Sequence, residues 1–210
     1  MKSIRFFFLS ALLFIFNLSV FGQQRPEVTL TLNEAFMDAA IDAVLQKGEP
    51  PSIELREQTD PACRESIRVV RETNGVRTTV RFREGRIIAP IAFVGNYKMP
   101  IIGCVDISGW AEAIIDLELD SANQRILARV RVKNVSLNGT GGVGSALVAR
   151  LVQSSIDQMV NPIEIIKLEK LSFAFPIQTA GSLRLIATGF RYTVQPGSVN
   201  LHVSYEFIRT

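Results

Sequence analysis

The sequence predicts an α+β protein in which long antiparallel strands and two amphipathic helices bury their apolar faces against one another. Three observations support this class. Apolar residues alternate with charged residues along residues 110–137, they recur at helical spacing over residues 34–46 and 143–160, and they alternate again between residues 171 and 207. A period of two is typical of strands with one apolar face, and the 3.6-residue period is typical of amphipathic helices. Apolar faces of this kind are stable only when they cover each other.

The strongest pattern is a hairpin whose turn is predicted at residues 121–124. The predicted cross-strand pairs are Ile115 with Val130, Leu117 with Ala128, Leu119 with Ile126, Asp116 with Arg129, and Glu112 with Lys133. One face of the hairpin would then be a ladder of ion pairs and the other an unbroken apolar strip. Each arm is about twice the usual strand length, so the strip would run about 35 Å. That is more than a compact core needs, which predicts an elongated apolar surface wrapped around something.

Both helices have recognisable ends. A short strand through Val28, Leu30 and Leu32 leads into the first helix, where Thr31 and Glu34 fit a capping box. Gly48 and the following Pro50-Pro51 pair would end this helix. The second helix is predicted from about Val143 to Val160, and Asn161-Pro162 would end it.

The remaining strands are placed by turn signals. Asn74-Gly75 suits a type I′ turn, since both residues tolerate positive φ. The hairpin around it would pair Ile67 with Phe82, Val69 with Val80, and Glu72 with Arg77. Pro90, Gly95 and Pro100 predict an edge or bent strand over residues 87–94. Three further strands are expected at residues 171–177, 183–194 and 199–207.

The first 22 residues have the pattern of a secretory signal. Lys2 and Arg5 precede an apolar run at residues 6–16, and small or compact residues, Val20 and Gly22, stand where a signal peptidase reads. We therefore expect cleavage before Gln23, a single domain over residues 23–210, and a periplasmic or extracellular location. The alternative is an uncleaved signal anchor, for which the apolar run is short.

Charge and cysteine content narrow the function classes. Residues 1–22 hold two of the 23 Lys and Arg and none of the 20 Asp and Glu, so cleavage lowers the net charge from +3 to +1. That balance gives no indication of nucleic-acid binding. Cys63 and Cys104 both follow the signal, and an even pair in an oxidising compartment predicts a disulfide. Two buried free thiols are the alternative.

No motif indicates catalysis. Residues 139–144, Gly-Thr-Gly-Gly-Val-Gly, match a dinucleotide-binding fingerprint, but the preceding strand carries alternate charges and no strand ending in an acidic residue follows at the required distance. We interpret this segment as a loop entering a helix. The single His202 faces outward on the last strand with no nucleophile beside it, so neither a catalytic triad nor a metal cluster can be assembled. We expect a protein without enzymatic activity, cofactor or metal.

Four segments together resemble the tubular lipid-binding (TULIP) superfamily: Val28–Phe36 followed by a long helix, the hairpin over residues 114–135, the second helix closing with Asn161-Pro162-Ile163, and the final strand over residues 197–207. The resemblance implies a long, twisted antiparallel sheet wrapped around two amphipathic helices, enclosing a tube for acyl chains. It further implies a small, single-module, exported lipid-binding or lipid-transfer protein that contacts membranes transiently. The oligomeric state stays open.

A tube of this kind would bind by the hydrophobic effect, since each buried methylene contributes about 0.8 kcal/mol. The candidate lining residues are Ile115, Leu117, Leu119, Ile126, Val130, Leu147, Leu151, Leu185, Leu201, Val203 and Tyr205. The competing hypothesis is a non-enzymatic structural or interaction protein of the cell envelope, in which the helices fill the tube.

Overall fold

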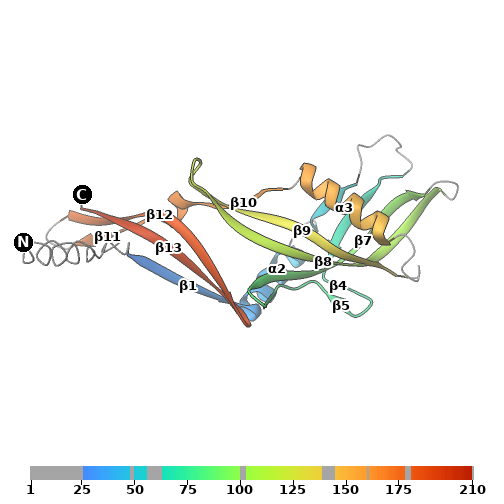
Figure 1. Ribbon diagram of the computed structural model, residues 1–210, viewed down its shortest axis with the longest axis horizontal. Helices are drawn as coiled ribbons and strands as arrows, with labels where there is room; N and C mark the ends of the chain where they lie inside the picture. Colours follow the sequence, from blue (N-terminus) through green and yellow to red (C-terminus); the bar gives the residue numbers. More distant parts are fainter. Residues whose placement is uncertain are drawn as a thin grey trace, which may run out of the picture.

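The computed structural model describes residues 26–47, 50–55, 63–99, 103–138, 145–159, 161–177 and 181–209 of the chain. The predicted signal at residues 1–22, its cleavage site and the glycine-rich segment at residues 139–144 lie outside these ranges. The described part is an elongated, mostly β molecule with two curled antiparallel sheets and two helices (Figure 1). The α and β elements expected from the sequence are therefore present.

The smaller sheet lies at one end of the molecule and has four strands in the order β1-β13-β12-β11 (Figure 1). Its strands are β1 (Glu27–Asn33), β11 (Phe173–Ile177), β12 (Gly181–Gln195) and β13 (Ser198–Arg209). Gln195 pairs with Ser198, so Pro196 and Gly197 form the turn between the two longest strands. The three C-terminal strands expected from alternation are confirmed.

The larger sheet has the order β10-β9-β8-β7-β3-β2, and β6 also pairs with β7. The strands are β2 (Ser52–Glu54), β3 (Ser66–Val70), β6 (Arg81–Arg83), β7 (Arg86–Met99), β8 (Gly103–Asp120), β9 (Arg125–Leu137) and β10 (Ile163–Lys167). A short 3-10 helix, η1 (Leu168–Leu171), then carries the chain from β10 to β11. The sequence predicted a single long sheet, whereas the structure has two. Strand pairing in the larger sheet ends with β10, and after η1 the chain enters the smaller sheet at β11.

The β8–β9 hairpin has the predicted register and turn. Ile115 faces Val130, Leu117 faces Ala128, Leu119 faces Ile126, and Asp116 faces Arg129. The ion pairs run diagonally, with Arg131 Nη2 2.6 Å from Asp116 Oδ2 and Arg129 Nε 3.0 Å from Glu118 Oε1. The expected Glu112–Lys133 pair is wrong, because a β-bulge after Glu112 places this residue opposite Asn134.

The Asn74-Gly75 turn is confirmed, but the hairpin around it is short. Both residues have positive φ, 46° and 76°, and the turn joins β4 (Glu72–Thr73) to β5 (Val76–Arg77). The longer pairing predicted for this hairpin is wrong: Ile67 faces Gly95, Val69 faces Phe93, and Phe82 faces Ile87. Since β7 pairs with both β3 and β6, these two strands do not pair with each other.

Of the two alternatives for residues 87–94, an edge strand or a bent strand, the edge strand is wrong, because β7 is a central strand. It pairs with β8 on one side over its whole length, and with β6 and β3 on the other. Pro90 lies where neither β6 nor β3 pairs with β7, so its missing N–H leaves no gap in the ladder. There the Thr79 N–H donates to the Pro90 carbonyl at 3.1 Å, and the Ala92 N–H donates to Thr78 Oγ1 at 2.9 Å.

Helix α2 (Glu34–Lys47) begins at a different cap from the one predicted. The Phe36 N–H donates to Asn33 Oδ1 at 2.8 Å, which makes Asn33 the N-cap. Thr31 instead donates to Asn200 Oδ1 across the sheet, and Glu34 accepts from the Phe82 N–H at 2.9 Å. The capping-box prediction is therefore wrong by two residues, since both of its members contact neighbouring strands.

Helix α3 (Ser145–Met159) covers one face of the larger sheet. Its apolar side, which includes Val148, Val152 and Ile156, is buried against Ile67 and Phe93 of that sheet. Asn161 follows this helix, and its N–H donates to the Ile156 carbonyl at 2.7 Å. The second helix is thus confirmed over its described residues.

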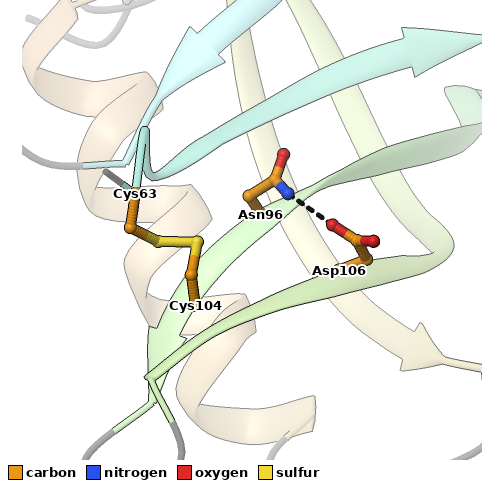
Figure 2. Close-up of a disulfide and its surroundings, with 4 residues drawn as sticks. All are labelled: Cys63, Asn96, Cys104 and Asp106. Carbon is orange, nitrogen blue, oxygen red and sulfur yellow. Dashed lines mark hydrogen bonds between the residues drawn. A yellow bond between two sulfur atoms is a disulfide. The ribbon is translucent and has the colours of Figure 1, made fainter. Parts of the chain in front are cut away.

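The predicted disulfide is present between Cys63 and Cys104, with their Cα atoms 5.5 Å apart (Figure 2). It joins the residue that precedes β3 by three positions to the second residue of β8.

Candidate functional site

The inner face of the four-stranded sheet is the candidate site. Strand pairing places Val28 opposite Val203 and Leu185 opposite Phe207. Directly paired residues project from the same face, so every strand contributes to one apolar surface. The inner face is defined by Val28, Leu30, Leu32, Phe173, Phe175, Ile177, Leu183, Leu185, Ala187, Phe190, Tyr192, Val194, Val199, Leu201, Val203, Tyr205 and Phe207.

The centre of the inner face is a filled core. Ile126 and the completely buried Leu168 pack there against Leu185, Val203 and Tyr205. The Tyr205 hydroxyl donates to the Leu171 carbonyl at 2.9 Å, and burial raises the pKa of Tyr205. This hydrogen bond fixes η1 over the sheet, because a buried hydroxyl needs a partner.

A second filled region lies near β6 and α2. Val199 of the inner face is buried with Val80, Phe82 and Ile87, and Leu201 packs against the same cluster. Met37 and Ile41 of α2, Ile115 and Leu117 of β8, and Leu32 of β1 also contact it. Residues of both sheets therefore share this cluster.

The rest of the inner face is open. Six large apolar side chains on it are between 41% and 55% exposed: Val28, Leu30, Phe173, Phe175, Ile177 and Phe207. We call these six residues the open inner face. The Phe173 ring stands edge-on to the rings of Phe175 and Tyr205, with centroids 5.2 and 5.6 Å away. A hollow of about 560 Å³ lies at this end of β13, and its described lining is Pro26, Thr188, Tyr205, Glu206 and Phe207.

The opposite face of the same sheet is polar. His202 lies between two threonines, with Nδ1 3.0 Å from Thr29 Oγ1 and Nε2 3.1 Å from Thr193 Oγ1. Arg191 donates two hydrogen bonds to the Glu27 carboxylate, which lowers the pKa of Glu27. His202 is therefore part of a polar surface network, as its outward position in the sequence pattern predicts.

The eleven predicted lining residues are divided among three places. The cluster around Leu168 holds Leu119, Ile126, Leu185, Val203 and Tyr205, and the cluster around Phe82 holds Ile115, Leu117 and Leu201. The cluster beneath α3 holds Val130 and Leu151, and Leu147 is 54% exposed on that helix. The clusters around Leu168 and Phe82 each contain residues of both sheets. The cluster beneath α3 contains residues of the larger sheet and of α3. Of the eleven, Tyr205 lines the 560 Å³ hollow.

The open inner face includes residues that sequence reasoning did not select. The sequence predicts a strand that contains Phe173 and Phe175, and their alternation in Phe-Ala-Phe is the signal that indicates an apolar face. Val28 and Leu30 also alternate with polar residues. Ile126 of β9 and Leu168 of η1 cover the centre of the inner face, and these exposed side chains lie outside that cluster.

A metal centre is not found in the part of the chain that the structure describes. There, no three His, Cys, Asp or Glu side chains are grouped so that they could hold a metal ion. None of the described helices is long and apolar enough to cross a membrane.

No protein-family model matches the sequence, and no curated protein matches it.

Proposed function

We propose that this protein is an exported lipid-binding or lipid-transfer protein of the TULIP type, whose ligand is an acyl chain held against the inner face of the four-stranded sheet. The observation that carries the proposal is the open inner face. Phe173, Phe175 and Ile177 alternate along one edge strand, β11, and Val28 and Leu30 along the other, β1. Soluble proteins rarely leave rows of large apolar side chains exposed unless another molecule covers them.

The arrangement suits an acyl chain better than a compact polar ligand. Phe173, Phe175 and Phe207 offer apolar contacts, and Tyr205 at the neighbouring hollow has its hydroxyl occupied by Leu171. Affinity would come from removing methylene groups from water, at about 0.8 kcal/mol for each. Transfer would require transient contact with a membrane, from which the chain could move onto this surface.

The test measures binding of a fluorescent fatty acid to the purified protein and to charged variants. Phe175→Glu and Phe207→Glu each place a carboxylate on the open inner face, and we expect each to weaken binding about tenfold or more, since the acyl chain would have to desolvate that charge. Val44→Glu is the matched control, because Val44 is 59% exposed on α2 and not on the inner face. We expect unchanged affinity for this control.

The second candidate function is that of a non-enzymatic structural or interaction protein of the cell envelope. It is favoured by the packing of Ile126 and Leu168, which fill the space between the sheets. Native mass spectrometry of protein purified from its own membrane extract separates the two candidates. A retained lipid supports the first, whereas absence of any lipid together with no fatty-acid binding supports the second.

A further inference from the structure

The larger sheet has a second hollow, of about 720 Å³, on the face turned away from α3. Alternate residues of β2, β3, β7 and β8 line it. The intervening residues Ile53 and Ile67 pack in the cluster beneath α3. The face toward the hollow is polar instead, with Glu54 and Ser66 in one cross-strand row and Ser52 and Arg68 in the next. This polar face is therefore hollowed, unlike the flat outer face of an ordinary sheet.

Small side chains and a glycine lie along this hollow. Small side chains form much of its floor, among them Ser52, Ser66 and Ser108. A Cβ atom at Gly95 would overlap the Ser66 carbonyl oxygen, so β3 and β7 can approach this closely only because residue 95 is glycine. The close pairing of β3 and β7 beside the hollow therefore depends on glycine at this position.

Two cations on this surface have no partner. Arg64 and Arg68 both line the hollow, both are exposed, and within the described residues neither guanidinium forms a hydrogen bond or an ion pair. Arg71 and Arg81, by contrast, are paired with carboxylates of α2. A free guanidinium offers a planar fork of donors that matches a carboxylate or phosphate.

Hydrogen-bonding groups also line this hollow. Ser66, Asn96 and Asp106 form a row across β3, β7 and β8, and Asn96 Nδ2 donates to Asp106 Oδ1 at 2.5 Å (Figure 2). Arg68 lies two residues beyond Ser66 on β3, about 7 Å along the strand. Arg64 precedes β3 by two residues and also lines the hollow. The Cys63–Cys104 disulfide holds the segment before β3 to the strand that carries Asp106, as Figure 2 shows.

We propose that this hollow, the Arg64–Arg68 groove, binds an acidic saccharide, that is, a chain of hydroxyl-bearing rings with carboxylates at intervals. The guanidiniums would bind the carboxylates of the ligand. Ser66 and Asn96, with the two carboxylates that also line the groove, Glu54 and Asp106, would bind the hydroxyls. No aromatic side chain lines the described groove, so ligands held by ring stacking lack a platform. The proposal is independent of the acyl-chain function, because the groove belongs to the other sheet.

Calorimetry with the purified protein tests this proposal, using tetragalacturonic acid as the acidic probe and maltotetraose as the neutral one. We expect saturable binding of the acidic probe alone, weakened by added salt. Arg64→Gln and Arg68→Gln should each lower the affinity about tenfold, as expected for loss of a charged hydrogen bond. Arg83→Gln is the control, since Arg83 is exposed on β6 and does not line the groove.

Three results would overturn the proposal. The first is that tetragalacturonic acid does not bind, or binds no better than maltotetraose. In the second, Arg83→Gln weakens binding as much as the two groove variants, which would indicate general charge attraction. The third is that a glutamate tetrapeptide binds as tightly as the acidic saccharide, which would indicate a protein partner.

Discussion

Asp120 is a single residue whose ionisation is tied to the β8–β9 turn. Its carboxylate accepts from the Asn123 side chain at 2.8 Å and from Arg125 Nε at 2.9 Å, and these contacts lower the pKa of Asp120 to about 2. Because the folded pKa lies below the model-peptide value of 3.8, ionised Asp120 stabilises the fold above that value. This contribution is lost as the pH falls through about 2.

We expect Asn123→Ala to raise the pKa of Asp120 toward 3.8, because the first of these hydrogen bonds disappears. A carboxyl-detected NMR titration would measure the shift. Ser121→Ala is the control, since the Ser121 contact to Gln124 uses only its carbonyl oxygen. An unchanged pKa in Asn123→Ala would show that Arg125 and the Asn123 backbone N–H, which donates to Asp120 Oδ1 at 3.2 Å, suffice to hold the carboxylate ionised.

At the scale of the elements, α3 completes the edge of β9 where β10 ends. β10 pairs with β9 as far as Ala128. Beyond it, Asn161 accepts from the Val130 N–H at 2.9 Å and donates to the Val130 carbonyl at 2.8 Å, and Gln153 accepts from the Val132 N–H at 2.6 Å. These side chains replace a neighbouring strand, and an edge occupied in this way cannot pair with another chain.

Asn161→Ala should therefore destabilise the protein by about 1 to 3 kcal/mol, because both backbone groups of Val130 lose their partner. Urea unfolding followed by circular dichroism measures this change. Gln158→Ala provides the comparison, since Gln158 is exposed near the end of α3 and its side chain donates only to Ser154 Oγ, at 3.4 Å. Equal stability of the two variants would mean that water satisfies Val130 equally well.

At the scale of the whole molecule, the disulfide joins parts of the larger sheet that are far apart in sequence. Cys63 and Cys104 are 41 residues apart. In the chain-entropy model, a loop of this length contributes about 4 kcal/mol to the free energy of unfolding. The bond constrains the unfolded chain most, because the strands it connects are already held by β7 in the folded state.

The double variant Cys63→Ser with Cys104→Ser should lose about this free energy in urea unfolding. Reduction of the wild-type protein should lower its stability by the same amount, which separates the effect of the bond from that of the serines. Two free thiols per chain in the denatured, unreduced protein would contradict the bond itself.

Local patterns were sufficient to predict many elements. The alternation of residues 115–120 with 125–130 predicted the register of the β8–β9 hairpin, since a slip of one residue would reverse both faces. The Asn74-Gly75 turn, the three C-terminal strands and the body of α3 follow from equally local rules. The apolar character of the inner face could be predicted in the same way, from strict alternation in β13.

Long-range pairing could not be read from these patterns. Val69 pairs with Phe93 and not with Val80, because the longer strand β7 occupies the edge of β3. Alternation shows that a segment is a strand but does not identify its partner. The N-cap is Asn33 and not Thr31, because the side chains of Thr31 and Glu34 form hydrogen bonds with residues of other strands. Likewise, the tertiary arrangement alone decides that Tyr205 is buried and Phe207 is open, since both lie on one face of one strand and only the covering elements distinguish them.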